Sequence, residues 1–246
     1  MYGIVANSQD NWTSLVAWIF LGAGVIALIV LIILDNFRKH PLLDLHIFKE
    51  KLMVLSALSC SLAGVASTVF MFFDPLYLRI VRGMSPFLIG LLLAVIPAAQ
   101  ALISFFFASA VKTYGVANLL IFSIAAGFTA FALHWPITAD FPILALIAPF
   151  FLLGVNWGLS NSTSIAAVNQ VIPQSHIAAA FGTIATIWNI VGSILLAAST
   201  AVFHAVEKQH SFLPAFHEAV DFNIIVAAIF VVAGVILYLS LKGKKA

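Results

Sequence analysis

Ionisable residues that could act in catalysis or proton transfer are few in this sequence. Only 8% of its 246 residues are Asp, Glu, Lys or Arg. All of them fall in polar gaps or at the edges of long apolar stretches. A carboxylate inside a membrane span would be the default candidate for a proton relay. The sequence predicts no such carboxylate.

Metal and thiol chemistry have little support as well. His204, His210 and His217 cluster in and beside one polar gap, but no acidic or cysteine partner stands at a spacing typical of a metal site. The single cysteine, Cys60, lies in an apolar stretch, which excludes an intrachain disulfide. No paired carboxylates are available for acid–base catalysis. We therefore expect no catalytic residues, no metal, no cofactor and no enzymatic activity.

Neutral polar side chains are the remaining candidates for a binding site. Along Ile143–Ser164, the polar and aromatic residues fall within an arc of roughly 160° on a helical wheel. Small residues on the opposite side let a neighbouring helix approach closely. Lipid would leave the amides unpaired, so the polar arc is expected to face a cavity. With the polar seams of two further stretches, the predicted cavity-lining residues are Gln100, Asn156, Trp157, Ser160, Asn161 and Asn189.

Helix packing is the alternative role for these polar faces. Ser, Thr and Gly on one face of a membrane helix often bring helices together. We assign this role to Ser56, Cys60, Ser67, Ser193 and Thr200. Asn, Gln and Trp cost more to bury, so for these residue types both roles stay open.

The elements that must position these side chains are membrane-spanning helices. Hydrophobic residues make up 63% of the chain, against roughly 45–50% in soluble domains, which excludes a soluble or disordered protein. Seven apolar stretches of roughly 20 residues can each cross a hydrocarbon core of about 30 Å. We expect an all-α, polytopic transmembrane bundle. Its seven spans are Leu15–Leu34, Leu52–Phe73, Phe87–Ala110, Leu119–Trp135, Ile143–Ser164, Ala178–His204 and Phe222–Leu241.

Prolines mark the predicted ends of several spans. Helices are expected to end or begin at Asp74-Pro75, Ser85-Pro86, Trp135-Pro136, Phe141-Pro142 and Ile172-Pro173. Within the third span, Pro97 removes a backbone donor and predicts a kink.

Basic residues gather on one side of the predicted membrane. That side carries Arg38, Lys39, Lys49, Lys51, Lys112, Lys242, Lys244 and Lys245, whereas the other carries Arg79, Arg82 and Lys208. Lys and Arg favour the cytoplasmic side, so we expect the N-terminus outside and the C-terminus in the cytoplasm. Residues Pro41–Lys51 alternate apolar and polar and predict a short amphipathic helix on the cytoplasmic surface, with a plain connector as the alternative.

Three sequence segments resemble a known transporter family. They are His40–Lys49 (HPLLDLHIFK), Asp74–Leu78 (DPLYL) and Gly83–Leu91 (GMSPFLIGL). Further on, Ile172-Pro173, Ala180–Gly182 and Trp188–Gly192 continue the pattern. Their order and spacing resemble the fourteen-span drug:proton antiporters of the major facilitator superfamily, the multidrug efflux type.

The resemblance implies that this chain is the C-terminal half of such a transporter. Residues 1–51 would form an extra transmembrane helix and a cytoplasmic amphipathic linker, and residues 52–246 the six-helix C-terminal bundle. The first, second, fourth and fifth helices of that bundle would line the central cavity. Leu52–Trp135 and Ile143–Leu241 would be two three-helix repeats of inverted topology.

Two features depart from the family pattern. The cytoplasmic gating loop of the family carries an Asp-Arg pair between glycines, whereas this chain keeps Gly115 and has Lys112, Thr113 and Ala117 at other positions of the motif. We therefore expect Lys112 and Gly115 to form a gating loop without charge pairing. The family's N-terminal half, with its membrane carboxylates, has no counterpart in these residues.

The sequence therefore predicts a transporter component that exports hydrophobic or amphipathic compounds by alternating access and is incomplete without an N-terminal half. We expect an integral protein of the bacterial plasma membrane. Its expected partners are the lipid bilayer, small amphipathic substrates and a separate N-terminal transporter half, and the small net charge of +2 predicts no nucleic acid. The alternative is a seven-span receptor-like protein, which shares the topology but whose coupling signatures the sequence lacks.

Overall fold

The computed structural model describes residues 45–243, together with isolated positions 19, 22–24, 26, 29–30 and 33. The first predicted span, Leu15–Leu34, lies largely outside these described residues, as do Pro41–Asp44 of the predicted amphipathic helix. The six remaining spans are described in full. They confirm an all-α bundle, five of whose helical segments are long and apolar enough to cross a membrane.

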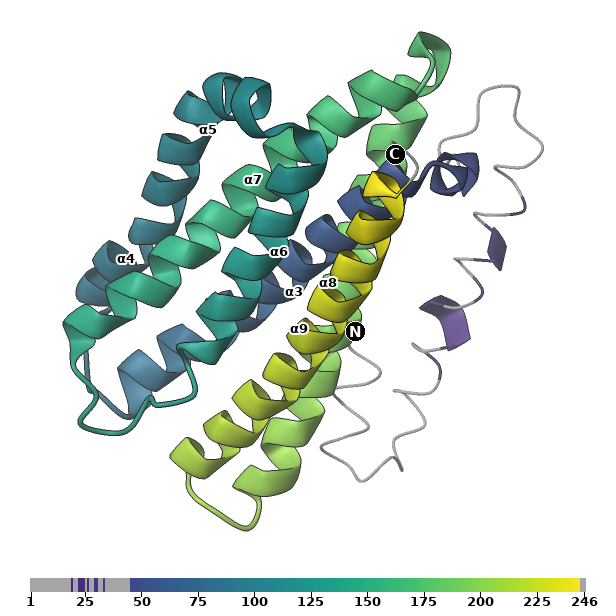
Figure 1. Cartoon of the computed structure of the whole chain (residues 1–246). Coiled ribbons are helices and arrows are strands. Elements are labelled where there is room, and N and C mark those ends of the chain that lie inside the picture. The colour runs from purple at the N-terminus through teal and green to yellow at the C-terminus, as the bar shows by residue number, and fades with distance from the viewer. Residues whose placement is uncertain are drawn as a thin grey trace.

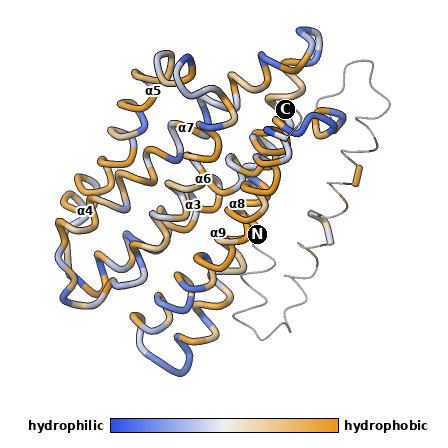
Figure 2. The backbone as a smooth tube through the Cα atoms, in the orientation of Figure 1, coloured by the Kyte–Doolittle hydropathy of each residue, from blue (hydrophilic) through white to orange (hydrophobic). Residues whose placement is uncertain are grey.

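The helices follow one another with short connections (Figure 1). The long ones are α3 (Lys51–Ile80), α5 (Val95–Tyr114), α6 (Val116–Ala132), α7 (Ile147–Val171), α8 (Ile177–Glu207) and α9 (Phe212–Lys242). The short ones are η1 (Leu45–Lys49), α4 (Pro86–Leu93), η2 (Ile143–Leu146) and η3 (Gln174–His176). Hydrophobic residues predominate along the central parts of the helices, and polar residues gather at the two ends of the bundle (Figure 2).

Helix α3 lies at the centre of the bundle. It packs against α6, α7, α8 and α9 (Figure 1). The most apolar window of α3 is 72% buried, more than that of any other candidate span among the described residues. Helices α4 and α5 instead lie at one side, where α5 packs mainly on α7 and α4 contacts α3 and α5. A side chain on α3 therefore points toward other helices, whereas most of α5 faces outward.

Glycines allow close approach at two helix crossings. A Cβ added at Gly64 of α3 would lie 2.6 Å from the carbonyl oxygen of Trp188 in α8. A Cβ added at Gly154 of α7 would lie 2.3 Å from the carbonyl oxygen of Ile96 in α5. In each crossing, the first helix of one predicted repeat packs on the second helix of the other. This exchange is the pattern that two inverted repeats would produce.

Proline sites explain several of the helix ends. Ser85 caps α4 through its Oγ, which accepts a hydrogen bond from the Leu88 amide at 3.4 Å, and Pro86 takes the first helical position. The third span breaks at Ala94, between α4 and α5. This confirms the predicted kink, because the ring of Pro97 collides with the carbonyl four residues earlier, that of Leu93.

The predicted helix end at Asp74-Pro75 is wrong. Helix α3 continues through Pro75 to Ile80. A proline inside a helix costs one hydrogen bond, and here Tyr77 and Leu78 bury their side chains in the bundle on the far side of it. Asp74 is therefore inside a membrane-length helix, which corrects the expectation that no ionisable residue lies in a span.

The predicted amphipathic helix at Pro41–Lys51 is not an α-helix in its described part. Leu45–Lys49 form a 3₁₀ helix, and α3 starts at Lys51. Ile47 is buried rather than Phe48, which is half-buried, because the tighter turn rotates Ile47 toward α3. This segment therefore covers the end of the bundle.

Candidate functional site: a pocket between three helices

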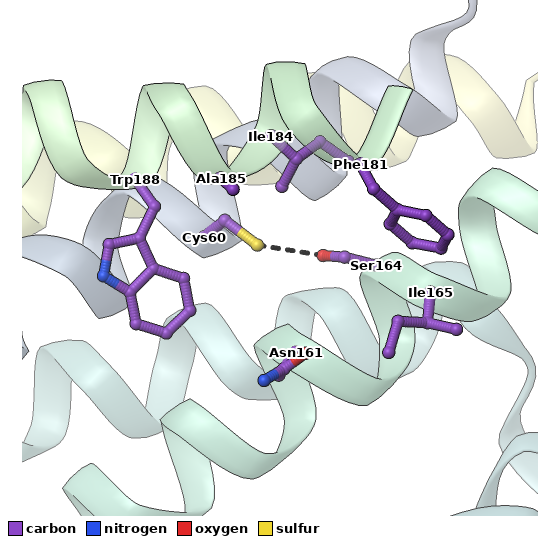
Figure 3. Close-up of a pocket in the computed structure, with 8 residues that line it drawn as sticks. All are labelled: Cys60, Asn161, Ser164, Ile165, Phe181, Ile184, Ala185 and Trp188. Atoms are coloured by element: carbon purple, nitrogen blue, oxygen red, sulfur yellow. Dashed lines mark hydrogen bonds between the residues drawn. The ribbon is translucent and has the colours of Figure 1, made fainter. Parts of the chain in front are cut away.

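A pocket of about 420 Å³ lies between α3, α7 and α8 (Figure 3). Its lining residues carry no charge. Two aromatic rings, those of Phe181 and Trp188, flank it from α8 (Figure 3). The other lining residues are Cys60 of α3, Asn161, Ser164 and Ile165 of α7, and Ile184 and Ala185 of α8.

Polar groups occupy the floor of the pocket. The Sγ of Cys60 lies 2.9 Å from the Oγ of Ser164, and the Oγ of Ser56 donates a hydrogen bond to the same Ser164 oxygen at 2.7 Å. Asn161 is exposed at the pocket wall. The pocket thus offers aromatic and aliphatic contact with a few uncharged hydrogen-bonding groups, as pockets for small amphipathic molecules do.

Of the six predicted cavity-lining residues, Asn161 lines this pocket. Trp157 lies next to it, with ring centroids of Trp157 and Trp188 6.5 Å apart. The Nε1 of Trp157 donates a hydrogen bond to the carbonyl oxygen of Ala63 at 3.2 Å. Trp157 therefore fixes the position of α7 on α3 beside the pocket.

Asn156 and Ser160 are fully buried and lie in contacts between helices. The Nδ2 of Asn156 donates hydrogen bonds to the carbonyl oxygen of Ser123 at 2.9 Å and to its Oγ at 3.1 Å. The Oγ of Ser160 lies 2.7 Å from the Oγ of Ser123 and 2.8 Å from the Oγ of Ser59. These bonds join α7 to α6 and α3.

The remaining predicted site residues lie away from the pocket. Gln100 is half-buried on α5. Asn189 is exposed on α8, and its Nδ2 donates a hydrogen bond to the carbonyl oxygen of Ala185 in its own helix, at 2.8 Å. Lys112 is exposed in the last turn of α5, and Gly115 joins α5 to α6 with a φ of 78°, a conformation that favours glycine.

Sequence patterning missed most of the pocket wall. Phe181, Ile184 and Trp188 are apolar and cannot be distinguished by residue type from lipid-facing positions. Cys60 had been assigned to helix packing. The regular spacing of Phe181, Ile184, Ala185 and Trp188 along one face of α8 was the available signal.

A buried ionisable pair was missed as well. The Nε2 of His134, just past the end of α6, lies 3.3 Å from the Oδ2 of Asp74 in α3, and both side chains are almost fully buried. Within the described part of the chain, no group of three or more His, Cys, Asp or Glu residues could hold a metal ion.

Comparison with known proteins identifies the family. The family model that describes the Major Facilitator Superfamily matches residues 3–197. The chain belongs to the major facilitator superfamily. Members of this superfamily are membrane carriers, so the chain is an integral membrane protein of a transporter family and not an enzyme. The receptor alternative is not favoured.

Relatives within the superfamily are transporters and efflux pumps. The multidrug efflux pump LfrA of Mycolicibacterium smegmatis is 20% identical, over 87% of this chain and 42% of its own length. The efflux pump DEP3 of Fusarium langsethiae is 26% identical, over 91% of this chain and 42% of its own length. The MFS transporter L2 of a Phoma species is 35% identical over 37% of this chain and 15% of its own length. The chain thus spans less than half the length of these relatives.

Proposed function

We propose that this chain is one half of an efflux transporter, exporting hydrophobic or amphipathic compounds by alternating access. The pocket between α3, α7 and α8 carries the proposal, since it combines aromatic walls with uncharged polar groups. Alternating access requires a second bundle that moves against the first around a shared site. A separate N-terminal half or a second copy of this chain would supply that bundle.

The outward face of α4 and α5 exposes large apolar side chains. Phe87 and Phe105 are 78% and 81% exposed, and Leu91 is 62% exposed. Exposed apolar area of this kind is unfavourable in water. In the bilayer, lipid or the second bundle would cover it.

We propose that the C-terminus lies in the cytoplasm and the N-terminus outside, in a bacterial plasma membrane. Lys49, Lys51, Lys112 and Lys242 lie at the bundle end where α5 meets α6 and α9 finishes. The opposite end carries Arg79, Arg82 and Lys208. The bias of basic residues toward the cytoplasm supports this orientation.

Thiol labelling tests the pocket. Asn161→Cys, in a Cys60→Ser background, is expected to react with a polar thiol reagent, and Nile red, a neutral amphipathic aromatic, is expected to slow that reaction by occupying the pocket. Cys60→Ser keeps a hydrogen-bonding group next to Ser164. The matched control is Asn189→Cys, an exposed polar position of α8 outside the pocket lining.

Equal labelling rates at Asn161→Cys with and without Nile red would contradict a substrate pocket here. Slowing at both Asn161→Cys and Asn189→Cys would also contradict it, because the dye would then act through the membrane and not through the pocket.

A further inference from the structure

The hydrogen bonds of the Asp74–His134 pair determine how many protons the pair holds. The Nδ1 of His134 lies 2.7 Å from the carbonyl oxygen of Ala130, which can only accept a hydrogen bond. Nδ1 therefore carries a proton and donates it to that carbonyl. One proton is then left for the contact between Nε2 and the Oδ2 of Asp74. Whichever atom holds it, the pair is neutral overall.

Aromatic rings exclude water from the pair. The ring of Phe70 lies 4.1 Å from that of His134 and 4.6 Å from that of Phe131, centroid to centroid. Phe150 closes another side at 6.2 Å from His134. In such surroundings, a net charge on the pair is strongly unfavourable. While the helices are packed as they are here, the pair is therefore held to one shared proton.

The contact between Asp74 and His134 also holds the end of α3 against the loop between α6 and α7. The hydroxyl of Tyr77 donates a hydrogen bond to the carbonyl oxygen of Thr138 at 2.7 Å. The Nη1 of Arg82 donates to the carbonyl oxygens of Ala139 at 2.6 Å and Phe141 at 2.8 Å. Within the loop, Ile137 is fully buried. Residues 133–142 thus form a strap held by the end of α3.

Proline adds a point of flexibility next to the carboxylate. Pro75 follows Asp74 and has no amide hydrogen, so the carbonyl of Met71 receives no helical hydrogen bond from it. The last turn of α3, which carries Tyr77, can therefore tilt with less cost than a continuous helix.

Other titratable groups at this end of the bundle lie farther from the carboxylate. His134 is the titratable side chain in contact with Asp74 among the described residues. The remaining groups on the elements around it are Tyr77, Arg79 and Arg82 near the end of α3, Asp140 in the strap, His204 and Glu207 on α8, and His217, Glu218 and Asp221 on α9.

We propose that Asp74 and His134 form a buried proton-binding site that locks the strap to α3. In the packed state, the pair shares one proton. A second proton, taken from water, produces a carboxylic acid next to an imidazolium, removes the attraction and leaves a net positive charge. Because that charge is unfavourable inside the aromatic enclosure, proton binding favours release of the strap. This inference rests on the proposed function only for the idea that proton binding drives export. The pair is then a candidate group for coupling protons to transport within this chain.

The pH dependence of strap release tests the site. Ile137→Cys, in a Cys60→Ser background, reports release, because this buried position reacts with a thiol reagent only when the strap lifts. In the full-length chain in lipid nanodiscs, we expect labelling to be slow near neutral pH. On acidification it should rise by up to about tenfold per pH unit across one protonation step. Rates are corrected for the pH dependence of a fully exposed cysteine.

Variants separate a proton site from a purely structural contact. Asp74→Asn should abolish the pH step, whereas Asp140→Asn, which removes an exposed acid of the same loop, should leave it in place. Ile124→Cys, buried on α6 outside the strap, should stay protected throughout. The reciprocal exchange Asp74→His with His134→Asp should restore the step, and it serves as the test if Asp74→Asn does not fold.

A wild-type chain without a pH step, or a step that persists in Asp74→Asn, would overturn the proposal. The assay involves no substrate and no transport. A failure of the efflux function would therefore leave its result unchanged, and a failure of the proton site would leave the pocket labelling unchanged.

Discussion

Asn156 and Asn161 stand on the same helix and have different surroundings. Asn156 is fully buried and binds Ser123 of α6, whereas Asn161 is exposed at the pocket wall. Helical-wheel analysis placed both in one polar arc of roughly 160°. An arc of this width faces two neighbouring elements at once, so it does not separate a residue in a helix contact from a residue in a pocket. The described geometry makes Asn156 a link between helices and places Asn161 at the pocket wall.

The link between Asn156 and Ser123 can be measured by a double-mutant cycle. Asn156→Ala, Ser123→Ala and the double variant should show a coupling of about 0.6 kcal/mol, the average between membrane helices, and at most about 1.7 kcal/mol in the free energy of unfolding. Asn189→Ala is the matched control, because the side-chain hydrogen bond of Asn189 among the described residues lies within its own helix. Unfolding in mixed micelles, followed by circular dichroism, gives these values. Zero coupling would mean that the two residues do not hold α6 and α7 together.

At the scale of the elements, helix existence was predictable and helix ends were less so. Apolar length predicted the six described spans, and Pro97 predicted the break between α4 and α5. Asp74-Pro75 failed as an end signal, because residues beyond the proline bury enough surface to continue α3. The pair between Asp74 and His134 could not be predicted, since it depends on which turns of α3 and α6 meet. The pocket wall on α8 depends in the same way on the crossing of α3 and α8.

The crossing of α3 and α8 depends on Gly64 having no side chain. Gly64→Ala places a methyl group 2.6 Å from the carbonyl oxygen of Trp188, so the helices must separate. We expect a loss of about 1–3 kcal/mol in the free energy of unfolding. Gly90→Ala on α4 meets nothing within 4 Å and should cause no loss, since alanine favours helix more than glycine does. Equal effects of the two substitutions would contradict close packing at Gly64.

Considered as a whole molecule, the described bundle has a pocket on one side of its central helix and a broad apolar exterior. Its length is less than half that of the efflux pumps it resembles. The family gives the transporter class, and the pocket is the proposed binding surface. Alternating access needs a second bundle to close that surface from the other side. We therefore expect a single copy of this chain to bind substrate without transporting it, and transport to require two bundles.

Transport by single copies in lipid vesicles tests this separation most directly. The purified chain is reconstituted at a density where most occupied vesicles hold one copy, and uptake of ethidium, a permanently charged aromatic dye that crosses a bilayer only slowly by itself, is followed vesicle by vesicle under an imposed proton gradient. We predict no transport in vesicles with one copy, and transport only where a second copy or a separate N-terminal half is present. Transport at the same rate per chain in single-copy vesicles would contradict the proposal that the chain is one half of a transporter.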